Sequence, residues 1–127
     1  MDLLLDTHVF LWWLGDDPNL GPETRTRIER TSNSVFVSAA TAWEIAVKRA
    51  SGRLVAPGDI GQWIVDEGFF ELAIDVVHAV ESAELPGHHK DPFDRLLIAQ
   101  ARSEGLTLVA RDDQMEKYDV SILDASR

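Results

Sequence analysis

Four carboxylates occupy matching places in this sequence, just past apolar runs or near the starts of helical segments. Asp6 follows the run "LLL", and Asp112 lies just past the run "LTLVA". Glu44 and Asp94 come early in "AATAWEIAVK" and "DPFDRLLIAQA", whose apolar residues have helical spacing. Because ligands of parallel α/β sheets bind where the strands end, we expect these four side chains to gather at one edge of a sheet.

A cluster of carboxylates a few ångströms apart repels itself unless it takes up protons or a divalent cation. Oxygen ligands favour Mg²⁺ or Mn²⁺, and the sequence has no cysteine to supply thiolate ligands. Such a cation polarises a phosphodiester and lowers the pKa of a bound water. The chemistry that these residues favour is therefore metal-dependent phosphodiester hydrolysis.

Each acid also has a purely structural interpretation. Asp6 or Asp112 could cap the helical turn that follows it, and Asp94 could be the capping-box acid of a helix capped by Asp91. Glu44 could form a surface pair with the lysine four residues later, worth about 0.3–0.5 kcal/mol. Apolar residues lie on both sides of Glu44 around the predicted helix, however, so only a narrow part of the helix surface there is polar. We therefore expect Glu44 to be partly buried. One shared acidic pocket explains all four acids together, whereas the structural interpretations need four separate coincidences.

The composition limits the classes of protein to which the chain can belong. Its 127 residues are enough for one domain, so we expect a single domain over residues 1–127. The 12 basic and 22 acidic residues give a formal charge of −10, which opposes passive binding of nucleic acid but suits a basic protein partner. No stretch approaches the roughly 20 apolar residues of a membrane span. We therefore expect a soluble, cytoplasmic protein with no membrane partner.

The acids are carried by an alternation of strands and helices. Apolar and β-branched runs predict strands at 3–5, 34–38, 69–74, 106–110 and 120–123. Amphipathic segments predict helices at 9–15, 21–30, 39–52, 59–68, 76–84 and 91–105, with a short helical turn at 112–118. Strands joined through helices form right-handed crossovers, so the fold class is α/β, with a mainly parallel central sheet covered by helices on both faces.

Four segments, taken in order, resemble the motifs of a known family. They are "LLLDTH", "SAATAWEIAVK", "HHKDPFDRLLIAQA" and "LVARDD". Over nearly the whole chain they look like PIN-domain ribonucleases, specifically the VapC-type toxins of bacterial toxin–antitoxin pairs. The resemblance implies a PIN-like three-layer α/β/α sandwich, endoribonuclease activity with Mg²⁺ or Mn²⁺ on an RNA substrate, and neutralisation by a cognate antitoxin.

Carried over motif by motif, the resemblance assigns the same four acids as catalytic residues and metal ligands: Asp6, Glu44, Asp94 and Asp112. It also places Thr7 as a polar neighbour of the first acid. Relatives commonly have a threonine two residues before the fourth acid, where this chain has Ala110. That departure leaves open whether Asp112 or the adjacent Asp113 is the fourth acid.

Other side chains have less specific interpretations. His88 and His89 could contact RNA or metal, but are more simply loop residues, and His8 is more simply packed in the first helix than a general base. Arg95 could steer phosphate or be an ordinary surface arginine. The segment "VFLWWL" is apolar on every side, which favours burial in the core or under a second copy or an antitoxin. We therefore expect a homodimer or a toxin–antitoxin hetero-oligomer.

Two other functions fit a small acidic α/β domain. A receiver-like phospho-acceptor signalling domain has a similar length, but it needs an acidic pair after an early strand and a lysine ending a late strand. The segments "LDTH" and "LTLVA" supply neither. A non-catalytic α/β binding domain would have the same capped helices without cooperating acids. Metal-dependent RNA cleavage separates the ribonuclease from both alternatives.

Overall fold

The computed structural model describes residues 1–88 and 90–127, with the side chains of all of these except Asp113 and Gln114. In this part of the chain the strands are β1 (Asp2–Leu5), β2 (Ser34–Ser38), β3 (Phe70–Leu72), β4 (Thr107–Ala110) and β5 (Ile122–Asp124). The helices are α1 (Thr7–Leu14), α2 (Pro22–Glu29), α3 (Ala39–Ala50), α4 (Ile60–Asp66), α5 (Val76–Glu84) and α6 (Pro92–Glu104), with a 3₁₀ turn η1 (Asp113–Lys117).

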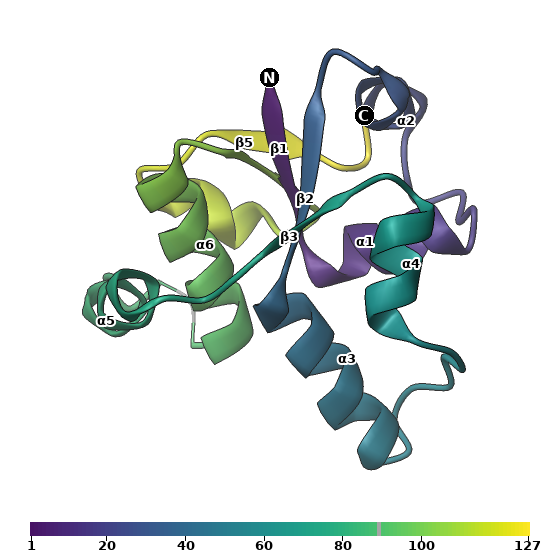
Figure 1. Ribbon diagram of the computed structural model, residues 1–127. Helices are drawn as coiled ribbons and strands as arrows, with labels where there is room; N and C mark the ends of the chain where they lie inside the picture. Colours follow the sequence, from purple (N-terminus) through teal and green to yellow (C-terminus); the bar gives the residue numbers. More distant parts are fainter. Residues whose placement is uncertain (89) are drawn as a thin grey trace.

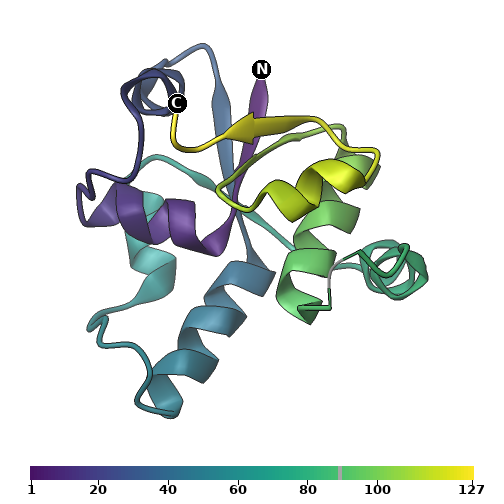
Figure 2. The ribbon, with the colours of Figure 1, turned by 180° about the vertical axis from the view of Figure 1, so that it is seen from behind.

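The strands form one parallel sheet in the order β3-β2-β1-β4-β5. The central strand is β1, in which Leu4 lies opposite Phe36 of β2 and Leu108 of β4. Because all strands run the same way, their carboxyl ends lie at one edge of the sheet. Figures 1 and 2 show α1, α3 and α6 beginning at this edge. The predicted α/β class and parallel sheet are confirmed.

The alternation of side chains along β1 divides the interior into two cores. Leu3 and Leu5 pack in one cluster with residues of α1, α2 and α4, whereas Leu4 packs in the other with residues of α6 and η1. All three leucines are fully buried, and each such burial is worth about 1.5–3 kcal/mol relative to exposure. Helices therefore cover both faces of the sheet, which confirms the three-layer α/β/α sandwich.

The apolar helix α1 is covered largely by this chain's own core. Val9 and Phe10 are fully buried, and the four residues that follow are partly buried and pack against the same cluster. Burial within the core thus explains most of the apolar surface of α1.

Within residues 1–88 and 90–127, no helix has both the length and the apolar character needed to cross a bilayer.

Several element boundaries differ from those predicted. Helix α1 begins at Thr7 rather than at residue 9, because Asp6 caps it through the Val9 N–H group. Strand β3 is shorter than 69–74, and β5 covers Ile122–Asp124 rather than 120–123. Both strands lie at the edges of the sheet and pair on one side only, so fewer ladder hydrogen bonds fix their ends.

Candidate metal centre

The carboxyl ends of β1 and β4 meet at Asp6. The side-chain Oδ1 of Asp6 accepts a hydrogen bond from the Val9 backbone N–H at 2.8 Å, which caps α1. Its Oδ2 accepts from the N–H of Arg111, directly after β4, at 3.4 Å. The capping interpretation of Asp6 is therefore correct. Because 3.4 Å is long for an N–H···O bond, Oδ2 is the oxygen more available to a ligand.

Burial gives Asp6 an electrostatic character that is unusual for a helix cap. Only 3% of the residue is exposed, and this removal from water raises the pKa of its carboxyl from 3.8 to about 6. The backbone N–H groups of Val9 and Arg111 and the charge of Arg111 oppose the rise, whereas the negative charge of Glu44 adds to it. A cation beside Asp6 would therefore lower the free energy of its ionised form.

Glu44 is buried near Asp6 and is held by two partners. Its side-chain Oε1 accepts a hydrogen bond from the Thr7 hydroxyl at 2.6 Å, and its Oε2 lies 3.1 Å from Nζ of Lys48. The Thr7 hydroxyl also lies 3.2 Å from that of Thr41. The predicted pair with Lys48 exists, but the Glu44 side chain is buried, with 5% exposed, rather than on the surface. Thr41 was not among the predicted site residues, although its position three residues before Glu44 on a helix could have identified it.

The first turn of α6 packs beside α3 at the same edge of the sheet. Asp91 caps α6, since its Oδ1 accepts from the N–H groups of Phe93 at 2.8 Å and Asp94 at 3.3 Å. The rings of Phe93 and Trp43 meet edge to face, with centroids 4.8 Å apart. Phe93 directly precedes Asp94, and Trp43 directly precedes Glu44, so the contact between the rings shows that the two acids lie on adjoining helices. Asp94 is half-buried, and its role as a metal ligand stays a prediction.

The charges around His8 show that several elements converge near this site. Burial lowers the pKa of the His8 imidazole, and the positive charges of Arg111 and Lys48 lower it further. Glu44 and Asp91 act in the opposite direction. These groups come from α3, from the residue after β4 and from the cap of α6, so the segments that carry the predicted acids lie within electrostatic reach of one side chain.

Two adjacent residues, Asp112 and Asp113, are candidates for the fourth acid. Asp112 is half-buried just past the end of β4, where it helps to line a small cavity of about 20 Å³ with Arg111 and Asp124. The side chain of Asp113 lies outside the described part of the structure, so the choice between the two acids stays open. Ala110, two residues before Asp112, is 2% exposed.

Arg95 has a structural partner that the sequence did not indicate. Its guanidinium donates to backbone carbonyls at the end of α5 and just beyond it, and these belong to Ser82, Ala83, Leu85 and Pro86 at 2.7–3.4 Å. A cation there satisfies carbonyls that have no partner within the helix. Arg95 therefore caps α5 and fixes the start of the segment that leads to α6.

His88 is exposed, with its ring 5.2 Å from that of Tyr118, and His89 lies outside the described residues.

A second group of potential ligands lies where α5 packs on α6. Ligand atoms of Asp75, His78 and Glu104 lie within 4.8 Å of one another, and His78 is 1% exposed. Its Nδ1 accepts from the Asp75 backbone N–H at 3.2 Å in a capping box, and its Nε2 lies 2.9 Å from Oε1 of Glu104. Because Nδ1 accepts, the neutral ring carries its proton on Nε2 and donates to Glu104. The group holds α5 against α6. The spacing of Asp75 and His78 in "DVVH" is a capping-box signal that was not among the predicted features.

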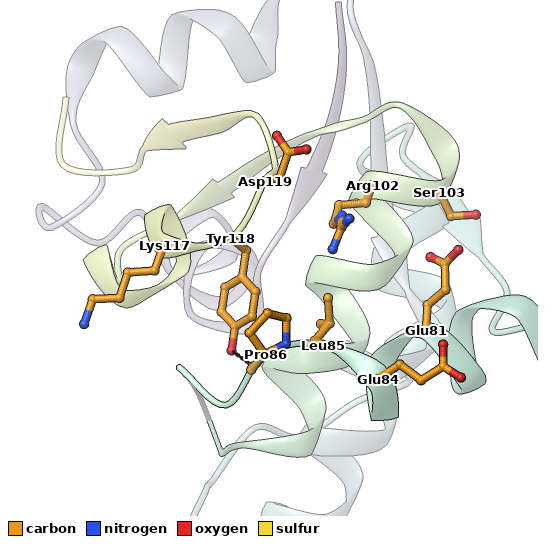
Figure 3. A pocket seen from close by; sticks show the side chains of 9 residues that line it. All are labelled: Glu81, Glu84, Leu85, Pro86, Arg102, Ser103, Lys117, Tyr118 and Asp119. Carbon is orange, nitrogen blue, oxygen red and sulfur yellow. Dashed lines mark hydrogen bonds between the residues drawn. The ribbon is translucent and has the colours of Figure 1, made fainter.

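A cavity of about 670 Å³ lies between the end of α5, the last turns of α6 and the segment after η1 (Figure 3). Its wall carries both signs of charge, from Glu81, Glu84, Arg102, Lys117 and Asp119. The Tyr118 hydroxyl closes one side by donating to the Pro86 carbonyl at 2.9 Å. None of the four predicted acids is among the described residues that line it, so this cavity and the acids are separate features of the molecule.

Comparison with known proteins identifies related sequences and folds. The family model described as PIN domain matches residues 3–121. Ribonuclease VapC22 of Mycobacterium tuberculosis is 27% identical over 119 residues, which cover 91% of each chain. The structures of VapBC2 from Rickettsia felis bound to a promoter DNA fragment and of DNA-bound VapBC from Salmonella typhimurium match with TM-scores of 0.70 and 0.68. Their identities are 12% and 23%, and each match covers 98% of both chains, so these two structures share the fold.

Proposed function

This chain belongs to the PIN domain family, and we propose that it is an endoribonuclease toxin, hydrolysing RNA phosphodiester bonds and neutralised by a cognate antitoxin. Its relative VapC22 is named a ribonuclease, and VapBC2 of Rickettsia felis is described together with promoter DNA. The match over residues 3–121 favours this function over the receiver-like and non-catalytic alternatives. We propose one PIN domain over residues 1–127, acting in the cytoplasm, where its RNA substrate is found.

The observation that carries the proposal is the pair of buried carboxylates Asp6 and Glu44. Both are nearly inaccessible. Burial is the main cause of the raised pKa of Asp6, and the negative charge of Glu44 raises it further. Such a pair at the carboxyl edge of a parallel sheet suits a divalent cation, and a donor set of oxygen atoms suits Mg²⁺ or Mn²⁺. The proposed ligands and catalytic residues are Asp6, Glu44, Asp94 and Asp112.

The chain's own residues hold these acids in place. When bound, the divalent cation supplies positive charge that polarises the phosphodiester and acidifies a water. Thr7 and Lys48 fix the orientation of Glu44 through a hydrogen bond and an ion pair, and the cap of α1 fixes Asp6. Lys48 and Arg111 bring positive charge to a site that would otherwise repel phosphate.

The antitoxin would recognise the same electrostatic feature. A formal charge of −10 favours association with a basic segment. We propose that such a segment places an arginine or lysine beside the acids, where its charge takes the place of the metal ion. The working assembly is then a toxin–antitoxin hetero-oligomer, built on single toxin chains or on a homodimer.

RNA cleavage by the purified protein with Mn²⁺ tests the proposal. Asp6→Asn and Asp94→Asn should each lower cleavage by about 100-fold or more, since each removes a ligand charge without changing side-chain size. Asp59→Asn is a matched control, because Asp59 is an exposed aspartate that caps α4 through the Gln62 N–H. That control should cleave as the parent does. Full cleavage by Asp94→Asn, free of contaminating nuclease, contradicts the site.

A further inference from the structure

Trp43 is a large apolar residue that the fold leaves in solvent. It lies in α3 and is 54% exposed, although the next residue, Glu44, is 4% exposed. Val47, one turn further along the same face, is 38% exposed. An exposed tryptophan contributes little to the core, and exposed apolar patches commonly mark binding surfaces.

The position of this ring relates it to the acids. The Trp43 ring meets the Phe93 ring of α6 edge to face, with an angle of 75° between their planes. Phe93 is itself half-buried and directly precedes Asp94. The aromatic pair therefore bridges the two helices that carry Glu44 and Asp94, at the edge of the sheet where both helices begin (Figure 1).

We propose that Trp43, held by Phe93, is a stacking platform for an unpaired base of the RNA whose phosphate lies at the acids. This inference rests on the proposed ribonuclease function and adds a substrate-binding residue to it. Aromatic side chains bind single-stranded nucleic acid by stacking on the π-face that every base presents. The contact with Phe93 restricts the Trp43 ring before the base arrives, which reduces the entropy lost on binding.

Charge considerations favour a base as the occupant of this surface. The chain carries a formal charge of −10, so contacts to phosphate alone are opposed by the field of the protein. Lys48, a cation on the same helix as Trp43, is already paired with Glu44 at 3.1 Å. Stacking is insensitive to net charge, and it selects single strands because the bases of a duplex are already stacked on one another.

The test measures binding apart from cleavage. Anisotropy of a short fluorescein-labelled single-stranded RNA is titrated with protein in chelator at fixed ionic strength, beside the same RNA as a duplex. Trp43→Ala should weaken binding of the single strand by roughly 5- to 150-fold and leave the duplex unaffected. Trp43→Phe should recover most of the affinity. In cleavage assays with Mn²⁺, Trp43→Ala should raise KM and leave kcat nearly unchanged.

Phe70→Ala is the matched control. Phe70 is 53% exposed and also belongs to an aromatic pair, with Phe36 at 5.5 Å, but it lies on the edge strand β3. Its loss should not change RNA binding. Single-stranded RNA should also quench tryptophan fluorescence in the parent and quench it much less in Trp43→Phe.

The outcomes separate this inference from the proposed function. If the parent binds the single strand through Trp43 but does not cleave it, the ribonuclease proposal fails and the platform stands. If the parent cleaves and Trp43→Ala is unchanged in KM and affinity, the platform is overturned alone. It is also overturned if the parent does not bind the single strand, if Trp43→Phe is as weak as Trp43→Ala, or if Trp43→Ala weakens only the complex with antitoxin.

Discussion

Neutralising Asp6 should change how the stability of this fold depends on pH. Burial raises the pKa of the Asp6 carboxyl from 3.8 to about 6, so between these pH values the native state binds more protons than the unfolded chain. Stability contributed by Asp6 is therefore fully present below pH 3.8 and is lost as the pH rises through about 6. At about 1.4 kcal/mol per pH unit, the loss amounts to about 3 kcal/mol.

The substitution Asp6→Asn removes this titration and keeps most of the local structure. An asparagine oxygen can still accept from the Val9 N–H group, so the cap of α1 survives. Its amide nitrogen would face the N–H of Arg111, which now donates to Oδ2 at 3.4 Å, and this opposition costs a roughly constant amount at every pH. The free energy of unfolding of the variant, relative to the parent, should therefore rise by about 2.4 kcal/mol between pH 4 and pH 7, because a small part of the loss already occurs below pH 4.

Urea denaturation in chelator at several pH values measures this difference. The decisive quantity is the slope of stability against pH, because it is unaffected by any constant penalty of the amide. Asp59→Asn, at an exposed helix cap, should leave the slope of the parent unchanged between pH 5 and pH 7. Parallel curves for the parent and Asp6→Asn across this range would refute the reasoning, and Asp6 would then be an ordinary cap.

Three further predictions concern Glu44, Asp94 and Arg95. In the metal-free protein, Glu44→Gln should lower the pKa of Asp6, because the charge of Glu44 now raises it, and the stability–pH curve should lose part of its fall near pH 6. Mn²⁺ at one hundred times its dissociation constant should stabilise the parent by about 2.7 kcal/mol, and thermal melts of Asp94→Asn should show a smaller gain; equal gains would remove Asp94 from the site. Arg95→Ala should lower the free energy of unfolding by about 2 kcal/mol through loss of the α5 cap, and Arg95→Lys should recover only part of it; an unchanged urea midpoint for Arg95→Ala would contradict the capping role.

The locations of Asp6 and Glu44 were predictable because they follow from the direction of the strands and from local periodicity. The unbroken leucine run before Asp6 indicates a strand covered on both faces, and a parallel sheet then fixes the edge at which Asp6 lies. Glu44 was expected to be partly buried because apolar residues flank it on α3, and it is 4% exposed. These inferences needed only local periodicity and the direction of the strands.

The contacts that hold the acids were not predictable in this way. The hydroxyl of Thr7 reaches Glu44 across 37 positions of the sequence, and the guanidinium of Arg95 reaches the carbonyls of Ser82 and Ala83 on a different helix. Periodicity assigns a residue to a face of its own element and does not give its partner on another element. The same limit applies to the ends of β3 and β5, which depend on pairing along one side only.

In the proposed site, Asp6 would link the stability of the fold to the binding of a cation. The carboxylate that begins α1 is also the one whose ionisation the interior disfavours, so the fold itself retains the electrostatic cost of its ionised form. A divalent cation or a basic antitoxin side chain beside Asp6 would offset this cost. The stabilisation available to either of them is the same few kcal/mol that ionising Asp6 costs the metal-free fold. One position beside Asp6 cannot hold both cations. An antitoxin side chain placed there would therefore stabilise the toxin and at the same time exclude the metal ion. Neutralisation would then need no change in the backbone of the sheet that positions the acids.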